Sequence, residues 1–225
     1  MTRLAPRRPR RAIAGGALAA LTATLAASGA LRRGDQYAVD HLMPWLRLQH
    51  HPFVSLTTLT VPDLHGGAAR ALLEVWTFPA AVVPSALVLL AAVSRLARRD
   101  AASWCLIWCT GNVLELVGKL SLAKPDLYRH AHHVTAFDMS LPSGHTIRAI
   151  VIAGAVAARW PTRQLAYVWA ATVPFALVMT GEHTASDVIA GVFVALALTA
   201  WAPMGERRKR RPQPSMPRLD LESTA

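Results

Sequence analysis

Long apolar runs alternate with short polar or basic links along most of this chain of 225 residues. A run of roughly 20 apolar residues is long enough to cross a lipid bilayer as a helix. We expect six such helices, at about 12–31, 72–96, 102–122, 145–160, 165–180 and 185–204. The pattern therefore predicts an all-α fold, a six-span transmembrane helical bundle.

The segment between the first two runs has a different pattern. Apolar residues recur through 32–71, but never over the length of a full span. We expect interfacial helices there, lying along the membrane surface between spans one and two. The first run follows a basic stretch, as the apolar part of a cleaved signal peptide also does. The length of the run favours a span that is retained in the mature protein.

Basic residues gather at the two ends of the chain and in two links, 95–99 and 159–163, and the net charge is +11. Nucleic-acid binding also produces basic chains, but this distribution is better explained by the rule that basic residues remain on the cytoplasmic side. Both termini are thus predicted to be cytoplasmic, in a multi-pass protein of the cell (plasma) membrane. The expected parts are a basic N-terminus (1–11), a membrane domain (12–204, with a core at 72–204 that bears the motifs) and a basic disordered tail (205–225).

The sequence Pro142-Ser143-Gly144-His145 lies directly before the fourth run. Ser143 can cap a helix whose first turn contains Gly144 and His145. A helix N-terminus suits an anion such as phosphate, and glycine lets the backbone approach it closely. His145 could then transfer a proton near neutral pH. The alternative is a capped helix with an incidental surface histidine.

Three further ionisable groups are expected at the same membrane face. Lys119 is near the outer end of the third run, and Glu115, four residues earlier, can pair with it. Spans four and five cross the membrane and return, so His183 comes back to the face of His145. Asp187, four residues after His183, could fix the orientation of its ring and leave one nitrogen free to attack. The alternative is that Asp187 only caps a helix.

Together these residues resemble the type 2 phosphatidic acid phosphatase superfamily, integral-membrane lipid phosphate phosphatases related to vanadium haloperoxidases. Its motifs are Lys-x6-Arg-Pro, Pro-Ser-Gly-His and Ser-Arg-x5-His-x3-Asp. The chain has the second motif in full, the end of the third and the first lysine. The resemblance implies an extracytoplasmic site with His183 as nucleophile, His145 as acid and base and Asp187 as orienting group. Lys119, Ser143 and Gly144 would bind the phosphate.

Two motif arginines are absent from their family positions. Asp126-Leu127 replaces Arg-Pro of the first motif, and Ala176-Leu177 replaces Ser-Arg of the third. We predict that Lys124 and Arg148 supply the missing charge. The alternative for Arg148 is that its side chain extends to the membrane interface.

The sequence thus predicts a metal-independent phosphatase without a cofactor, a phosphoric monoester or diphosphate hydrolase. Its substrate would be a lipid phosphate or polyprenyl diphosphate, and its intermediate a phosphohistidine. The alternative is a catalytically silent relative that binds or moves phospholipids. A metal site is a third hypothesis, which the irregular spacing of its possible ligands disfavours. These ligands would be His130, His132, His133 and His183. No nucleic-acid partner is expected.

Overall fold

The computed structural model describes residues 7–44, 67–122, 126–130, 132–134, 141–158, 160 and 163–202. Its helices are α1 (Arg7–Ala27), α2 (Arg32–His41), α3 (Ala68–Thr77), the 3-10 helix η2 (Phe78–Ala80), α4 (Val82–Val93), α5 (Arg98–Ser121), α6 (Gly144–Ala157), α7 (Arg163–Met179) and α8 (Ala185–Thr199). The strands described are β1 (Tyr128–Arg129) and β2 (His132–His133), which form one short antiparallel pair. The predicted all-α class is confirmed.

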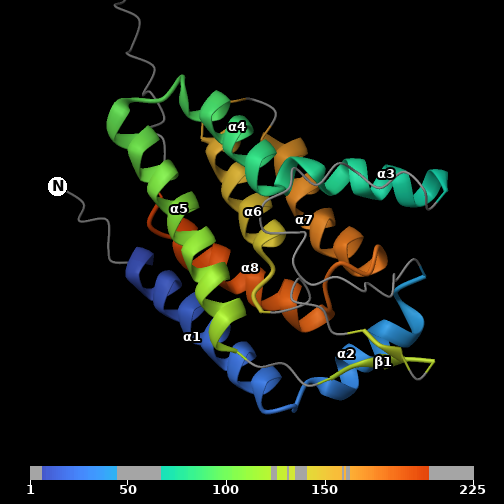
Figure 1. Cartoon of the computed structure of the whole chain (residues 1–225). Helices are drawn as coiled ribbons and strands as arrows, with labels where there is room; N and C mark the ends of the chain where they lie inside the picture. The colour runs from blue at the N-terminus through green and yellow to red at the C-terminus, as the bar shows by residue number, and fades with distance from the viewer. Residues whose placement is uncertain are drawn as a thin grey trace, which may run out of the picture.

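Helix α6 lies at the centre of the bundle, where it packs against α4, α5, α7 and α8 (Figure 1). Small residues allow the close approaches around it. A Cβ at Gly154 would lie 2.6 Å from the Trp104 ring of α5, and one at Gly111 would lie 2.7 Å from Ile147. Helix α1 packs along α8 in the same way, with Gly15 against the Ala197 backbone. The centre of the bundle therefore holds the helix that begins with the Pro-Ser-Gly-His sequence.

The predicted second span is broken in the structure. Helices α3 and α4 are separated by η2, and the chain bends there by 56°. Pro79 lies within η2, and Pro84 is the third residue of α4. Proline has no N–H, so Pro84 offers no hydrogen bond to the Ala80 carbonyl four residues earlier. The single helix expected over 72–96 is therefore wrong, and the Ala80 carbonyl is left to accept from elsewhere.

Helix length gives fewer candidate spans than the six predicted. Among the described residues, α5 alone, with 24 residues, is long and apolar enough to cross a membrane. Two bent pairs, α1 with α2 and α3–η2 with α4, raise the number to three if each pair is one span. Helices α6, α7 and α8 have 14, 17 and 15 residues, below the roughly 20 that a straight span needs.

Large apolar side chains nevertheless cover the outer surface of the bundle. Exposed examples are Leu21 of α1, Leu87 of α4, Leu106 and Leu120 of α5, and Leu165 of α7. Extended apolar surface is unusual on a protein surrounded by water, and it indicates a membrane protein. Of the predicted interfacial segment, 45–66 lies outside the described residues, as do 1–6 and 203–225 at the ends.

Candidate active site

The start of α6 has the predicted cap. The Ser143 Oγ accepts a hydrogen bond from the Thr146 backbone N–H at 3.3 Å and another from the Thr146 hydroxyl at 3.1 Å. Both side chains are fully buried. A buried cap of this kind fixes where the helix begins, and so fixes the positions of Gly144 and His145 in its first turn.

The start of α8 is joined to the start of α6. Helix α8 begins at Ala185, the expected start of the sixth apolar run. The Ser143 backbone N–H donates to the Asp187 carbonyl at 3.0 Å. Gly191 permits this approach, since a Cβ there would lie 2.7 Å from the Ser143 carbonyl oxygen. Two helix N-termini from distant parts of the sequence therefore meet at one place.

The two motif histidines lie beside each other at this junction. The ring centroids of His145 and His183 are 6.0 Å apart, with the rings edge to face. His183 is 2% exposed, whereas His145 is partly exposed. The prediction that these residues return to the same end of the bundle is confirmed, and their catalytic roles stay predictions.

Asp187 serves as a helix cap in this structure. Its Oδ2 accepts hydrogen bonds from the backbone N–H and the hydroxyl of Thr184, both at 2.9 Å. The same oxygen is 3.9 Å from Nδ1 of His183, too far for a hydrogen bond. This Nδ1 is buried and has no hydrogen-bond partner among the described residues. Asp187 thus forms the helix cap that was the alternative interpretation, and its role in orienting His183 stays a prediction.

An acidic residue from the N-terminal part of the chain supports the same helix start. In α2, Asp35 accepts hydrogen bonds from the Ser186 backbone N–H at 2.9 Å and from its hydroxyl at 2.6 Å. Both residues are buried. A carboxylate at a helix N-terminus is favoured by the unpaired N–H groups there. Sequence reasoning missed Asp35 because no local pattern links residues 151 positions apart.

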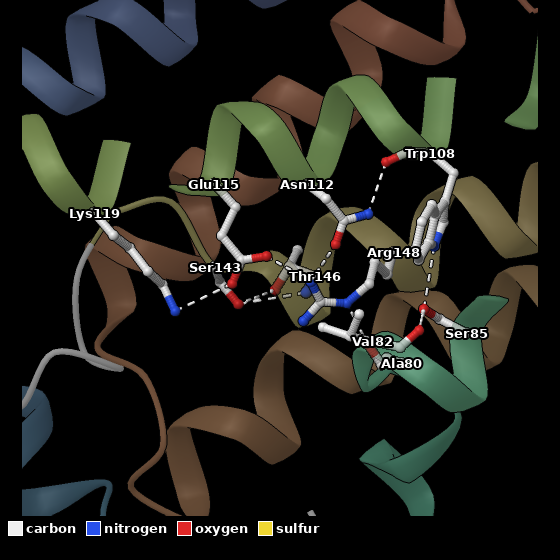
Figure 2. Close-up of polar contacts among 10 residues, drawn as sticks. All are labelled: Ala80, Val82, Ser85, Trp108, Asn112, Glu115, Lys119, Ser143, Thr146 and Arg148. Atoms are coloured by element: carbon white, nitrogen blue, oxygen red, sulfur yellow. Dashed lines mark hydrogen bonds and ion pairs between the residues drawn. The ribbon is translucent and has the colours of Figure 1, made fainter. Parts of the chain in front are cut away.

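The charged residues of α5 and α6 form one buried network (Figure 2). Lys119 Nζ is 3.1 Å from Glu115 Oε1, which confirms the predicted pair. Arg148 Nη1 donates to Glu115 Oε2 and, at 3.0 Å, to the Asn112 side-chain oxygen. Arg148 Nε donates at 2.7 Å to Ala80, whose carbonyl is freed by the helix break. The Glu115–Arg148 pair was not predicted from the sequence.

Arg148 does not extend to the membrane interface, because it is 2% exposed. That alternative is therefore wrong. The other predicted substitute, Lys124, lies outside the described residues. At the positions of the absent motif arginines, Asp126 is exposed and Leu177 is in the apolar core, as is Leu127 at the position of the motif proline. Neither arginine position therefore supplies a cation, and substitution by Arg148 or Lys124 stays a prediction.

The hypothesis of a metal site formed by four histidines stays a prediction. Within the described ranges, no three His, Cys, Asp or Glu side chains group closely enough to hold a metal ion. The side chains of His132 and His133, two of the four residues in that reading, lie outside the description.

Residues 105–211 match the family model of the PAP2 superfamily. The resemblance inferred from the sequence motifs is therefore confirmed over this segment. The PAP2 region covers most of α5, all of α6, α7 and α8, and every motif residue described above. No match was found among curated proteins or among solved structures. The family match supports phosphatase-type activity on phosphate esters.

Gly144 of the PAP2 region has a specific steric reason to be glycine. A Cβ at this position would overlap the Glu115 carboxylate. We therefore expect Gly144→Ala to push this carboxylate away from its two cations and to destabilise the protein by about 1–3 kcal/mol. The measurement is the midpoint of thermal unfolding in detergent.

The matched control for this substitution is Gly16→Ala in α1, where an added Cβ meets nothing within 4 Å. Alanine is the better helix former, so this variant should unfold at the same temperature or slightly higher. Equal midpoints for the two variants would contradict the steric account of Gly144.

Proposed function

We propose that this protein is an integral-membrane, metal-independent phosphatase that hydrolyses a lipid phosphate or a polyprenyl diphosphate. The observation that carries the proposal is that the ring centroids of His145 and His183 lie 6.0 Å apart at the N-terminus of α6, within the segment that matches the PAP2 family model. Two imidazoles beside a capped helix start are suited to transfer of a phosphoryl group and of the proton that accompanies it.

In the proposed reaction, one ring nitrogen of His183 attacks phosphorus. The bond between phosphorus and the lipid oxygen breaks, and His145 donates a proton to that oxygen. Water then attacks phosphohistidine while His145 removes its proton, and the phosphorus–nitrogen bond breaks to release phosphate. Lys119, Arg148 and the first N–H groups of α6 would stabilise the phosphoryl oxygens, with Lys124 as a further cation.

The proposed setting is the outer face of the cell membrane. The basic ends of the chain favour cytoplasmic termini, and six spans would then place the start of α6 on the opposite side. Helices shorter than a full span are compatible with this arrangement where the bilayer thins locally. The apolar outer surface would let the lipid tail stay in the membrane while its head group reaches the histidines.

The second candidate is a silent relative that binds phospholipid without hydrolysing it. The observation that favours it is that two cations near α6 in the described part of the chain, Lys119 and Arg148, contact the Glu115 carboxylate. The positions of the two motif arginines also hold no cation, since one is the exposed Asp126 and the other is the core residue Leu177. A phosphate site with fewer available cations would stabilise the charge of the transition state less well.

Phosphate release by the purified full-length protein distinguishes the two candidates. The assay uses detergent micelles containing phosphatidic acid, phosphatidylglycerol phosphate or undecaprenyl diphosphate, with EDTA present throughout. We expect release from at least one of these lipids at a rate that EDTA does not change. Activity that EDTA removes would contradict the metal-independent mechanism. Binding of the lipids by a folded protein that releases no phosphate would favour the silent relative.

A further inference from the structure

A carboxylate of the protein itself lies beside the start of α6. The Glu115 carboxylate lies against Gly144, the first residue of the helix, at the spot where a Cβ would overlap it. One of its oxygens is 3.1 Å from Lys119 Nζ, and the other accepts from Arg148 (Figure 2). Two cations therefore meet one side-chain anion beside a helix N-terminus.

The surrounding groups have the composition of an oxyanion site. Lys119 and Arg148 supply positive charge from two different helices, and both are largely buried. Within the described chain, the α6 N–H groups of Thr146 and Ile147 are used by Ser143, whereas those of Gly144 and His145 have no acceptor. Such first-turn N–H groups bind anions. Glu115 thus holds the two cations that a phosphoryl group bound at these first-turn N–H groups would also need.

We propose that Glu115 is an internal competitor of phosphate at this site, a residue that sets which phosphate compounds can bind. The inference rests on the proposed function. A phosphate group reaching Lys119 and Arg148 has to displace the carboxylate or to bind beside another negative charge. Either event weakens binding of the phosphate group by itself.

The consequence is a preference for lipid over soluble phosphates. A lipid substrate gains additional binding energy from its apolar tail, and this energy offsets displacement of Glu115. Inorganic phosphate has no such tail. Glu115 would therefore exclude small soluble phosphate compounds and hasten release of the phosphate product, while lipid phosphates still bind.

The test is the affinity of the purified full-length protein for inorganic phosphate, measured by equilibrium dialysis in detergent. Glu115→Gln keeps the size of the side chain and removes its charge. We expect this variant to bind phosphate at least about tenfold tighter than the wild type. Asp100→Asn, which removes a carboxylate from the opposite end of α5, is the matched control and should leave the affinity unchanged.

A purely structural role for Glu115 predicts a different result. Loss of a partner for Arg148 would then lower the unfolding temperature without raising phosphate affinity. A dissociation constant for Glu115→Gln that is within twofold of the wild-type value, or weaker, overturns the inference, as does absence of binding in both proteins. If Glu115→Gln does not fold, Glu115→Asp carries the test. Its shorter side chain withdraws the charge, and we expect about threefold tighter binding, with an unchanged affinity again overturning the inference.

Turnover of lipid by the same preparations separates this inference from the proposed function. An active wild type with unchanged phosphate affinity in Glu115→Gln overturns the competitor role alone. An inactive wild type whose Glu115→Gln variant binds phosphate more tightly supports the competitor role and overturns hydrolysis alone.

Discussion

Replacing His183 by alanine is expected to lower phosphate release from the preferred lipid by on the order of 10³-fold or more. The proposed nucleophile would be absent, so no phosphohistidine would form. His145, whose ring centroid is 6.0 Å from that of His183 in the wild type, would have no leaving oxygen to protonate and no intermediate for water to attack. The measurement is the initial rate of phosphate release under saturating lipid, with the amount of folded protein checked by size-exclusion chromatography.

The control for this substitution is His41→Ala in α2. This exposed histidine stacks on Tyr37 and is not part of the site. Its loss should change the rate by less than about twofold. A His183→Ala variant that keeps more than a tenth of wild-type turnover would show that another residue attacks phosphorus.

Replacing Arg148 by methionine is expected to destabilise the protein by about 3–5 kcal/mol. The substitution removes the guanidinium that donates to Glu115, Asn112 and the Ala80 carbonyl. It leaves Glu115 with Lys119 as its remaining cation, and it leaves the Ala80 oxygen without its donor at a break in the helix. The measurement is unfolding of the detergent-solubilised protein by increasing fractions of SDS.

Two further variants test the cause of this expected loss. Arg99→Met removes an exposed arginine from α5 and should change stability by less than about 0.5 kcal/mol. Arg148→Lys keeps a positive charge beside Glu115 without the planar guanidinium, and it should recover part of the loss. If the free energy of unfolding of Arg148→Met equalled that of Arg99→Met, the buried network would contribute little to folding.

Local patterns predicted the parts of the fold and site that depend on neighbouring residues. Ser143 was identified as a cap because serine before glycine and histidine, at the start of an apolar run, has a direct physical use there. The Glu115–Lys119 pair follows from a spacing of four along a helix. The approach of His145 to His183 follows from two consecutive helices that cross the bundle and return.

Features that depend on contacts between distant segments could not be predicted in this way. Nothing near Arg148 in the sequence indicates that its partners are Glu115 and the Ala80 carbonyl, 33 and 68 residues away. The break in the second apolar run had a local signal, since Pro79 and Pro84 lie inside it. Membrane helices tolerate some prolines, as α7 does Pro174, but this pair breaks the run.

The Thr184-x-x-Asp187 pattern also contains a local signal for a helix cap. An acidic residue three positions after a threonine at a helix start is typical of a capping box. The structure has this box, with Asp187 bonded to Thr184 rather than to His183. One carboxylate oxygen serves the cap, so an orienting bond to His183 would require a small rotation of one of the two side chains.

The most direct test of the phosphatase account is a rapid chemical quench of the wild-type protein during turnover of phosphatidic acid labelled with ³²P in its phosphate group. We predict that label is transferred transiently to the protein in an acid-labile, base-stable form, and that peptide mapping places it on His183. His183→Ala should show no labelled protein. Turnover of the wild type without any protein-bound label, or label that persists in His183→Ala, would contradict the proposed mechanism.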